Sequence, residues 1–107
     1  MVATPKSQVL DLSKLVSYQE ASVVSRQITK ADAGNVTLFA FDAGQELSEH
    51  TAPFDALVQV LDGEAEIRIS GRQYVLGIGQ AIVMPAGEPH AVKASKPLKM
   101  LLTMIRV

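Results

Sequence analysis

The sequence predicts an all-β protein with a single domain, folded as an antiparallel barrel or sandwich. At 107 residues the chain has room for one hydrophobic core. Runs rich in Val, Ile, Thr and Phe recur along the chain and are separated by Gly, Pro and Asn. Strands at a spacing of roughly eight to twelve residues, without a sustained helical period, are typical of barrels and sandwiches.

The expected strands follow a lead-in over residues 1–18, in which the leucines and Val16 suit one short helical turn. The strands expected from composition are 22–28, 35–41, 57–61, 64–70, 73–76, 81–84, 90–93 and 99–107. Asp62-Gly63 stands directly between two of these runs. Because both residues tolerate a positive φ, the pair predicts a tight hairpin at this point.

Two of the strands indicate what covers the sheets. In 64–70, Ala, Ile and Ile alternate with Glu, Glu and Arg, which predicts one buried and one solvated face. The last strand is apolar on both faces, with Met100, Leu102 and Met104 opposite Leu101 and Ile105. Such a strand needs cover on both sides. We expect the second cover to come from another subunit in a homodimer, with the N-terminal segment as the alternative.

Charge and composition narrow the classes of partner. The net charge is −1 with both signs scattered, so no basic face for nucleic acid or acidic lipid is expected. The chain has no cysteine, which excludes disulfides and thiolate chemistry. No charged leader precedes an apolar run, and no apolar run approaches the ~20 residues of a membrane helix. We therefore expect a cytoplasmic protein that uses neither a membrane nor nucleic acid.

The segment 79–94 carries the most specific pattern. It begins with Gly79, passes through a short apolar strand to Pro85 and Gly87, and reaches His90 where the next strand begins. Proline fixes its own φ, and glycine adopts backbone angles that other residues avoid. The pattern predicts a rigid corner that holds the histidine in one orientation, as a metal ligand or general base requires.

The segment 44–63 has a related pattern, with Gly44, then His50 after five residues, and Gly63 after a Val-Leu strand. The two segments resemble the first and second signature motifs of the cupin family. The resemblance implies a cupin-type antiparallel β-barrel, the double-stranded β-helix or jelly roll, over a single domain at 1–107. It also implies that His50 and His90 face one cavity.

In metal-binding cupins the first motif supplies two histidines and a carboxylate, and the second supplies a third histidine. Carried over by position, the resemblance gives His50 and His90 but places Ala52 and Ala56 where the other two ligands belong. Glu46 and Ser48 share the strand parity of His50 and are the nearest substitutes if the strand is regular. Asp55 is one residue out of register and would point away unless a bulge intervenes.

Three functions follow, from different classes. The leading hypothesis is a protein that binds a small molecule in the barrel, with His50, His90, Met84 and Met100 around the cavity. The second is a metal-dependent enzyme, such as a small dioxygenase or isomerase, with Fe, Mn, Zn or Ni on His50, His90 and an unidentified third ligand. The third is a non-catalytic dimer with a structural or interaction role.

Overall fold

The structure is a computed structural model that describes residue 4 and residues 6–107. Its elements confirm the all-β prediction, including one short turn of 3-10 helix in the lead-in. They are η1 (Leu12–Lys14), β1 (Val23–Ala31), β2 (Gly34–Phe41), β3 (Glu46–His50), β4 (Phe54–Asp62), β5 (Ala65–Ile69), β6 (Arg72–Leu76), β7 (Ala81–Met84), β8 (His90–Lys93) and β9 (Leu98–Arg106). Within the described residues, no helix is long and apolar enough to cross a membrane.

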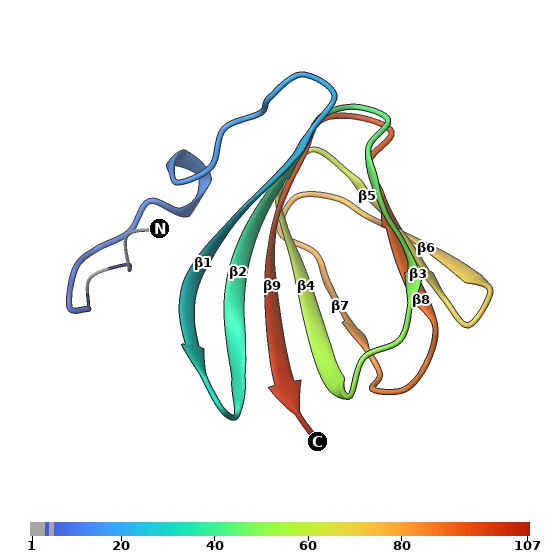
Figure 1. The fold of residues 1–107 in the computed structure, drawn as a ribbon. Coiled ribbons are helices and arrows are strands. Elements are labelled where there is room, and N and C mark those ends of the chain that lie inside the picture. The colour runs from blue at the N-terminus through green and yellow to red at the C-terminus, as the bar shows by residue number, and fades with distance from the viewer. Residues whose placement is uncertain (1–3, 5) are drawn as a thin grey trace.

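The strands form two antiparallel sheets that face each other across the core (Figure 1). The large sheet has the order β1-β2-β9-β4-β7, and the small sheet has the order β3-β8-β5-β6. From β2 onward every connection crosses between the sheets except the β5–β6 hairpin, which is a jelly-roll arrangement. The β3–β4 and β7–β8 connections meet at the same end of the barrel, the end at which β9 finishes (Figure 1).

The prediction of a hairpin at Asp62-Gly63 is wrong, because β4 and β5 do not pair. β4 pairs with β7 and β9 in the large sheet, whereas β5 pairs with β6 and β8 in the small sheet. Gly63 has the positive φ that the pattern predicted, 76°, but a Cβ at this residue would lie 1.9 Å from the carbonyl oxygen of Pro97. The glycine therefore allows a close backbone contact where the chain crosses between sheets. The turn residues were identified correctly, but the strand that follows has a different partner.

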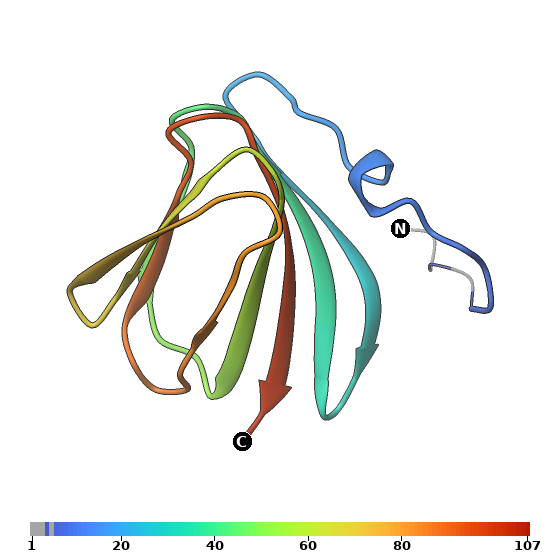
Figure 2. The same cartoon turned by 180° about the vertical axis from the view of Figure 1, so that it is seen from behind.

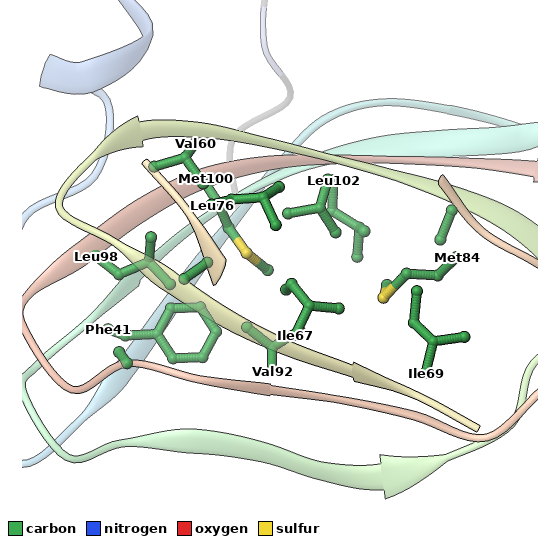
Figure 3. Packing of buried hydrophobic residues seen from close by; sticks show 14 residues of the cluster. Phe41, Val60, Ile67, Ile69, Leu76, Met84, Val92, Leu98, Met100 and Leu102 are labelled. Atoms are coloured by element: carbon green, nitrogen blue, oxygen red, sulfur yellow. The ribbon is translucent and has the colours of Figure 1, made fainter. Parts of the chain in front are cut away.

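The core lies between the inner faces of the two sheets, and Figure 3 shows its packing. Ala65, Ile67 and Ile69 on β5 are buried, which confirms the alternation expected for residues 64–70. From the large sheet, Phe41 and Met100 are fully buried against them. Burial of each large apolar side chain contributes about 1.5–3 kcal/mol, so this interior accounts for most of the driving force for folding.

A second, smaller cluster lies on the outer face of the large sheet. The N-terminal segment runs along this side of the molecule (Figure 2), and its Val16 packs with Leu38 and Ala40 of β2. Two hydrogen bonds hold this segment against the sheet. In the first, the Tyr18 hydroxyl donates to the Asp62 carboxylate. In the second, the Lys99 ammonium donates to the backbone carbonyl oxygen of Ser13, at 2.6 Å.

The outer face of β9 is thus covered at one end only. Leu101 packs with the N-terminal segment, which is the alternative cover that the sequence allowed. Near the C-terminal end of the strand, Ile105 remains 57% exposed, and Val83 on β7 is 54% exposed. A homodimer that covers this remaining surface stays a prediction.

Candidate functional site

The two histidines of the chain lie side by side at one end of the small sheet. His50 ends β3, His90 begins β8, and the two are directly paired across the strands. Their ring centroids are 4.4 Å apart with an interplanar angle of 70°, an edge-to-face arrangement. His90 is buried, at 4% exposure, whereas His50 is exposed. The pair therefore connects the barrel interior with solvent.

Backbone contacts between the two motif segments fix this arrangement. Gly87, with φ 77°, donates its N–H to the carbonyl oxygen of Ala52 at 2.9 Å. The N–H of the neighbouring Ala86 donates to Oδ1 of Asp55, also at 2.9 Å. Asp55 thus points away from the cavity, as its register predicts, and stabilises the corner that precedes His90. These two hydrogen bonds hold the Pro-Gly corner against the β3–β4 connection and β4.

The parity argument for Glu46 is wrong. The pairing of β3 with β8 shifts between Leu47 and His50, so the strand is irregular before the histidine. Leu47 and His50, three residues apart, both face the cavity, because one extra residue reverses the parity of a strand. Glu46 instead lines a hollow on the outer surface of the small sheet. It is not available as a third ligand beside the histidines.

The histidines form one wall of a small internal cavity of about 30 Å³. Met84 and Met100 line it, as does Met104. The full lining comprises Leu47, His50, Ala52, Ala56, Met84, His90, Val92, Met100, Leu102 and Met104. A volume of this size holds about one water molecule. The cavity therefore accommodates an ion or a small head group, rather than a complete organic molecule.

Hydrogen bonds assign the ring nitrogens of both histidines. Nδ1 of His50 lies 2.8 Å from the carbonyl oxygen of Ser48, and Nδ1 of His90 lies 3.1 Å from that of Glu88. A carbonyl oxygen only accepts, so in each ring Nδ1 carries the proton and donates it. In the neutral ring, Nε2 then keeps a lone pair. Each histidine uses a carbonyl two residues earlier in the chain, so the local backbone sets its orientation.

Burial keeps His90 neutral. Desolvation of the ring lowers the pKa of His90 below its ordinary value, and the nearby His50 lowers it further. The hydrogen bond to Glu88 opposes this shift by favouring the protonated form. The net direction is downward, so at neutral pH the buried ring presents an uncharged Nε2 with a free lone pair.

The same architecture is found in known proteins. The family model described as "Cupin domain" matches residues 37–105, which include every cavity-lining residue. The chain belongs to the cupin family. A search of curated proteins gives no match.

Solved structures of other cupins and related proteins superpose along nearly the whole chain. A conserved protein of unknown function from Streptococcus pyogenes is 37% identical, with a TM-score of 0.91 over 100% of this chain and 96% of that one. A cupin superfamily protein from Desulfitobacterium hafniense is 27% identical, with a TM-score of 0.90 and coverage of 99% and 97%. A cupin 2 conserved barrel domain protein from Leptotrichia buccalis is 37% identical, with a TM-score of 0.88 over 91% of this chain and 47% of that one.

The metal set implied by the cupin resemblance does not fit this cavity. Ala52 and Ala56 lie on its wall, so methyl groups stand where the resemblance places a histidine and a carboxylate. Across the described residues, no group of three or more His, Cys, Asp or Glu side chains could hold a metal ion. Catalytic sites for Zn²⁺ usually have three such protein ligands. The two histidines alone do not complete this type of site.

The sequence did not reveal the relation between Ala56 and the methionines. Ala56 is paired with Met84 on one side and with Met104 on the other. No local signal contains this information, because the three residues come from strands that are distant in the sequence. The sheet order β9-β4-β7 brings them into one row.

Proposed function

We propose that this cupin is a binding protein that holds its ligand against the paired histidines, rather than a catalyst with the usual cupin metal set. The observation that supports this proposal is the edge-to-face pair of His50 and His90, 4.4 Å apart at the wall of the barrel cavity. Apolar walls with a few oriented polar groups are typical of ligand sites. The two alanines at the ligand positions argue against a hard-metal enzyme.

The orientation of the rings restricts the chemistry of the ligand. Each Nδ1–H is already used by a backbone carbonyl, so Nε2 is the free position on both rings. With neutral rings, two lone pairs are presented, and these accept hydrogen bonds or coordinate a cation. The ligand group at this point is therefore a hydroxyl or N–H donor, or a metal ion, rather than an anion.

The dimensions of the cavity restrict how much of the ligand enters. The space of about 30 Å³ admits one small group, whereas pockets for whole drug-sized molecules measure roughly 300–1,000 Å³. Because His50 is exposed, the rest of a larger ligand would lie outside, over this ring. The buried His90, which lies behind His50, limits how far the ligand group can enter the cavity.

The histidine pair offers a direct test. The chain contains only two histidines, so a ¹H–¹³C spectrum of the imidazole rings has one Hε1 signal for each. A library of small alcohols, phenols, amines and amides is titrated into untagged protein, with matched carboxylates as the comparison. We expect binders among the donors, and we expect each binder to move both signals.

The matched control is Gln73→Ala, on the outer surface of the small sheet, which should bind as the wild type does. His50→Ala should abolish binding, and its effect on folding is small because the side chain is exposed. Binding that persists in His50→Ala, or a donor that binds while leaving both histidine signals unmoved, would refute the proposed site.

A second candidate role is assembly, and the exposed apolar row on the large sheet favours it. Leu57 on β4 is paired with Val83 on one side and with Thr103 on the other, and Ile105 extends the row along β9. Val83 and Ile105 are both more than half exposed. We propose that a second copy of the chain packs here, because a homodimer would complete the cover of β9. Light scattering at micromolar concentration should give twice the chain mass of 11.5 kDa for the wild type, and the chain mass for Val83→Lys/Ile105→Lys.

A further inference from the structure

We propose that the ligand of this cavity is a soft monovalent metal ion of the Cu(I) class, held by His50 and His90 together with the thioether sulfurs of Met84 and Met104. The inference rests on the proposed function, since it uses the same histidine pair, and it names the chemistry of the ligand. It differs from the usual cupin metal set in having two thioether sulfurs in place of one imidazole and the carboxylate.

The first observation is the position of the two methionines. Met84 on β7 and Met104 on β9 are the direct partners of Ala56 from its two sides. Side chains paired across neighbouring strands have Cβ atoms about 4.5–5.5 Å apart. The alanine has only a methyl group, so the longer side chains on both sides have room above it. Two thioethers thus flank the position at which the cupin resemblance places a carboxylate.

The second observation is that this methionine row faces the histidines. On the small sheet, His90 is paired with His50 on one side and with Ile69 on the other. Met84 and Ile69 belong to the same buried cluster, and Figure 3 draws both at one end of it. The row Met84–Ala56–Met104 of the large sheet therefore lies opposite the row His50–His90–Ile69 of the small sheet. Both histidines and both methionines line the same cavity of about 30 Å³.

The donor set selects the kind of ion. Thioether sulfur is a soft ligand, and soft ligands favour Cu(I), whereas carboxylates and water favour harder ions such as Mg²⁺ and Mn²⁺. Imidazole nitrogen serves copper as well as zinc. Two nitrogens and two thioethers are all neutral, and no carboxylate lines the cavity. A single positive charge costs less to bury among neutral donors than a double charge does.

Silver is the practical probe, because Ag(I) has the same charge and softness as Cu(I) but is stable in air. Untagged protein in chloride-free buffer is incubated with Ag(I), freed of excess ion and analysed for bound metal, and Cu(I) is then tested anaerobically against a competing chelator. We expect retention of about one ion per chain. Zn²⁺, Mn²⁺ and Ni²⁺ under the same conditions should be removed with the excess.

Variants identify the ligands. Leucine replaces methionine with little change in volume, so Met84→Leu/Met104→Leu removes both sulfurs and preserves the packing. This variant should bind Ag(I) at least about 10–100-fold more weakly, the loss typical even of outer partners of a metal site. His50→Ala should retain no ion. The matched control is Gln73→Ala, on the outer surface of the small sheet, which should bind Ag(I) as the wild type does.

A second readout locates the ion without relying on affinity. The chain has four methionines, and ¹³C labelling of their methyl groups gives one signal for each. Bound Ag(I) should shift the methyl signals of Met84 and Met104 far more than that of Met100.

Three results would overturn the inference. One is no retention of Ag(I) or Cu(I) by the wild type. Another is equal retention by Met84→Leu/Met104→Leu, and the third is retention of Zn²⁺ as strong as that of Ag(I). These failures leave the proposed function separately testable, because the histidine titration with organic donors uses no metal. If organic donors move both histidine signals while Ag(I) does not bind, only the metal assignment fails.

Discussion

The segments 79–94 and 44–63 each contribute one histidine to the same cavity, but they hold it in different ways. His90 follows a corner tied by two backbone N–H groups and is buried, at 4% exposure. His50 ends an irregular strand and is exposed. The segment 44–63 also has alanines at two ligand positions, Ala52 and Ala56. The comparison shows that the backbone arrangement around the site does not depend on the usual metal ligands, because it is kept although two of those ligands are replaced by alanine.

Among substitutions in these segments, those at Gly63 and Gly87 should differ most. Gly63→Ala would place a Cβ 1.9 Å from the carbonyl oxygen of Pro97 at φ 76°, so it combines a backbone clash with left-handed strain. We expect a loss of about 3 kcal/mol or more in the free energy of unfolding, or failure to fold. Gly87→Ala meets nothing within 4 Å and has only the strain of φ 77°, so it should cost about 1–2 kcal/mol. Urea denaturation measures both, and equal losses would contradict the distinction.

Introducing the two absent ligands should convert the cavity into a site that binds Zn²⁺ or Mn²⁺. Ala52→His/Ala56→Glu adds an imidazole and a carboxylate to the wall that already carries His50 and His90. Without metal, the buried carboxylate should lower the free energy of unfolding. With Zn²⁺ or Mn²⁺ at about 100 times its dissociation constant, binding should return about 2.7 kcal/mol.

Thermal denaturation with and without the ion measures this change. The matched control is Ala52→Gln/Ala56→Gln, which adds comparable bulk without a charged ligand. If the His/Glu variant shows no metal-dependent rise in melting temperature, the backbone arrangement does not hold the geometry that the resemblance implies.

Removing the hydrogen bond between Asp55 and Ala86, which joins the two segments, should have an intermediate effect on the free energy of unfolding. Asp55→Ala removes the acceptor of the Ala86 N–H, and a hydrogen bond to a carboxylate contributes roughly 1.5–3 kcal/mol. Because the side chain is partly exposed, we expect a loss of about 1–2 kcal/mol. Asp55→Asn keeps an oxygen at Oδ1 and should lose less. The His90 ring signal should broaden in Asp55→Ala but not in Asp55→Asn, and an unchanged signal in both would show that this hydrogen bond does not orient the ring.

The smallest effect is expected from pH. Burial lowers the pKa of His90 in the folded state below its ordinary value, so the unfolded chain binds the proton more readily. The free energy of unfolding should therefore decrease as the pH falls through the ordinary histidine value toward the folded one. Urea denaturation between neutral and mildly acidic pH measures the slope. His90→Gln should reduce the slope, and a stability that rises toward acid would contradict the assigned direction.

Much of the fold could be predicted from local patterns. The alternation in 64–70 identified the buried face of β5, because successive side chains of a strand point to opposite sides. The short helical turn of the lead-in was also expected, and the structure has it at Leu12–Lys14. The two motif segments and their histidines pointed to the family that the comparisons show.

The errors share one cause, which is that local patterns do not specify partners. Asp62-Gly63 is a turn by composition, but the following strand joins the other sheet, since the β4 edges are occupied by β7 and β9. Glu46 has the parity of His50 only if β3 is regular, and the strand is not. A shift of one residue moves every side chain to the opposite face, so a small irregularity overturns an otherwise sound inference.

The sequence by itself determined most of the strands, though not β3, together with the turn positions and the identity of the histidines, because these depend on period, backbone preference and residue type. Only the tertiary structure decided that Met84 and Met104 flank Ala56, that the cavity measures about 30 Å³, and that Val16 covers part of the outer face. These features depend on strand order and register between segments far apart in the chain. They are set by how two sheets close around one core, and no local stretch of sequence records that closure.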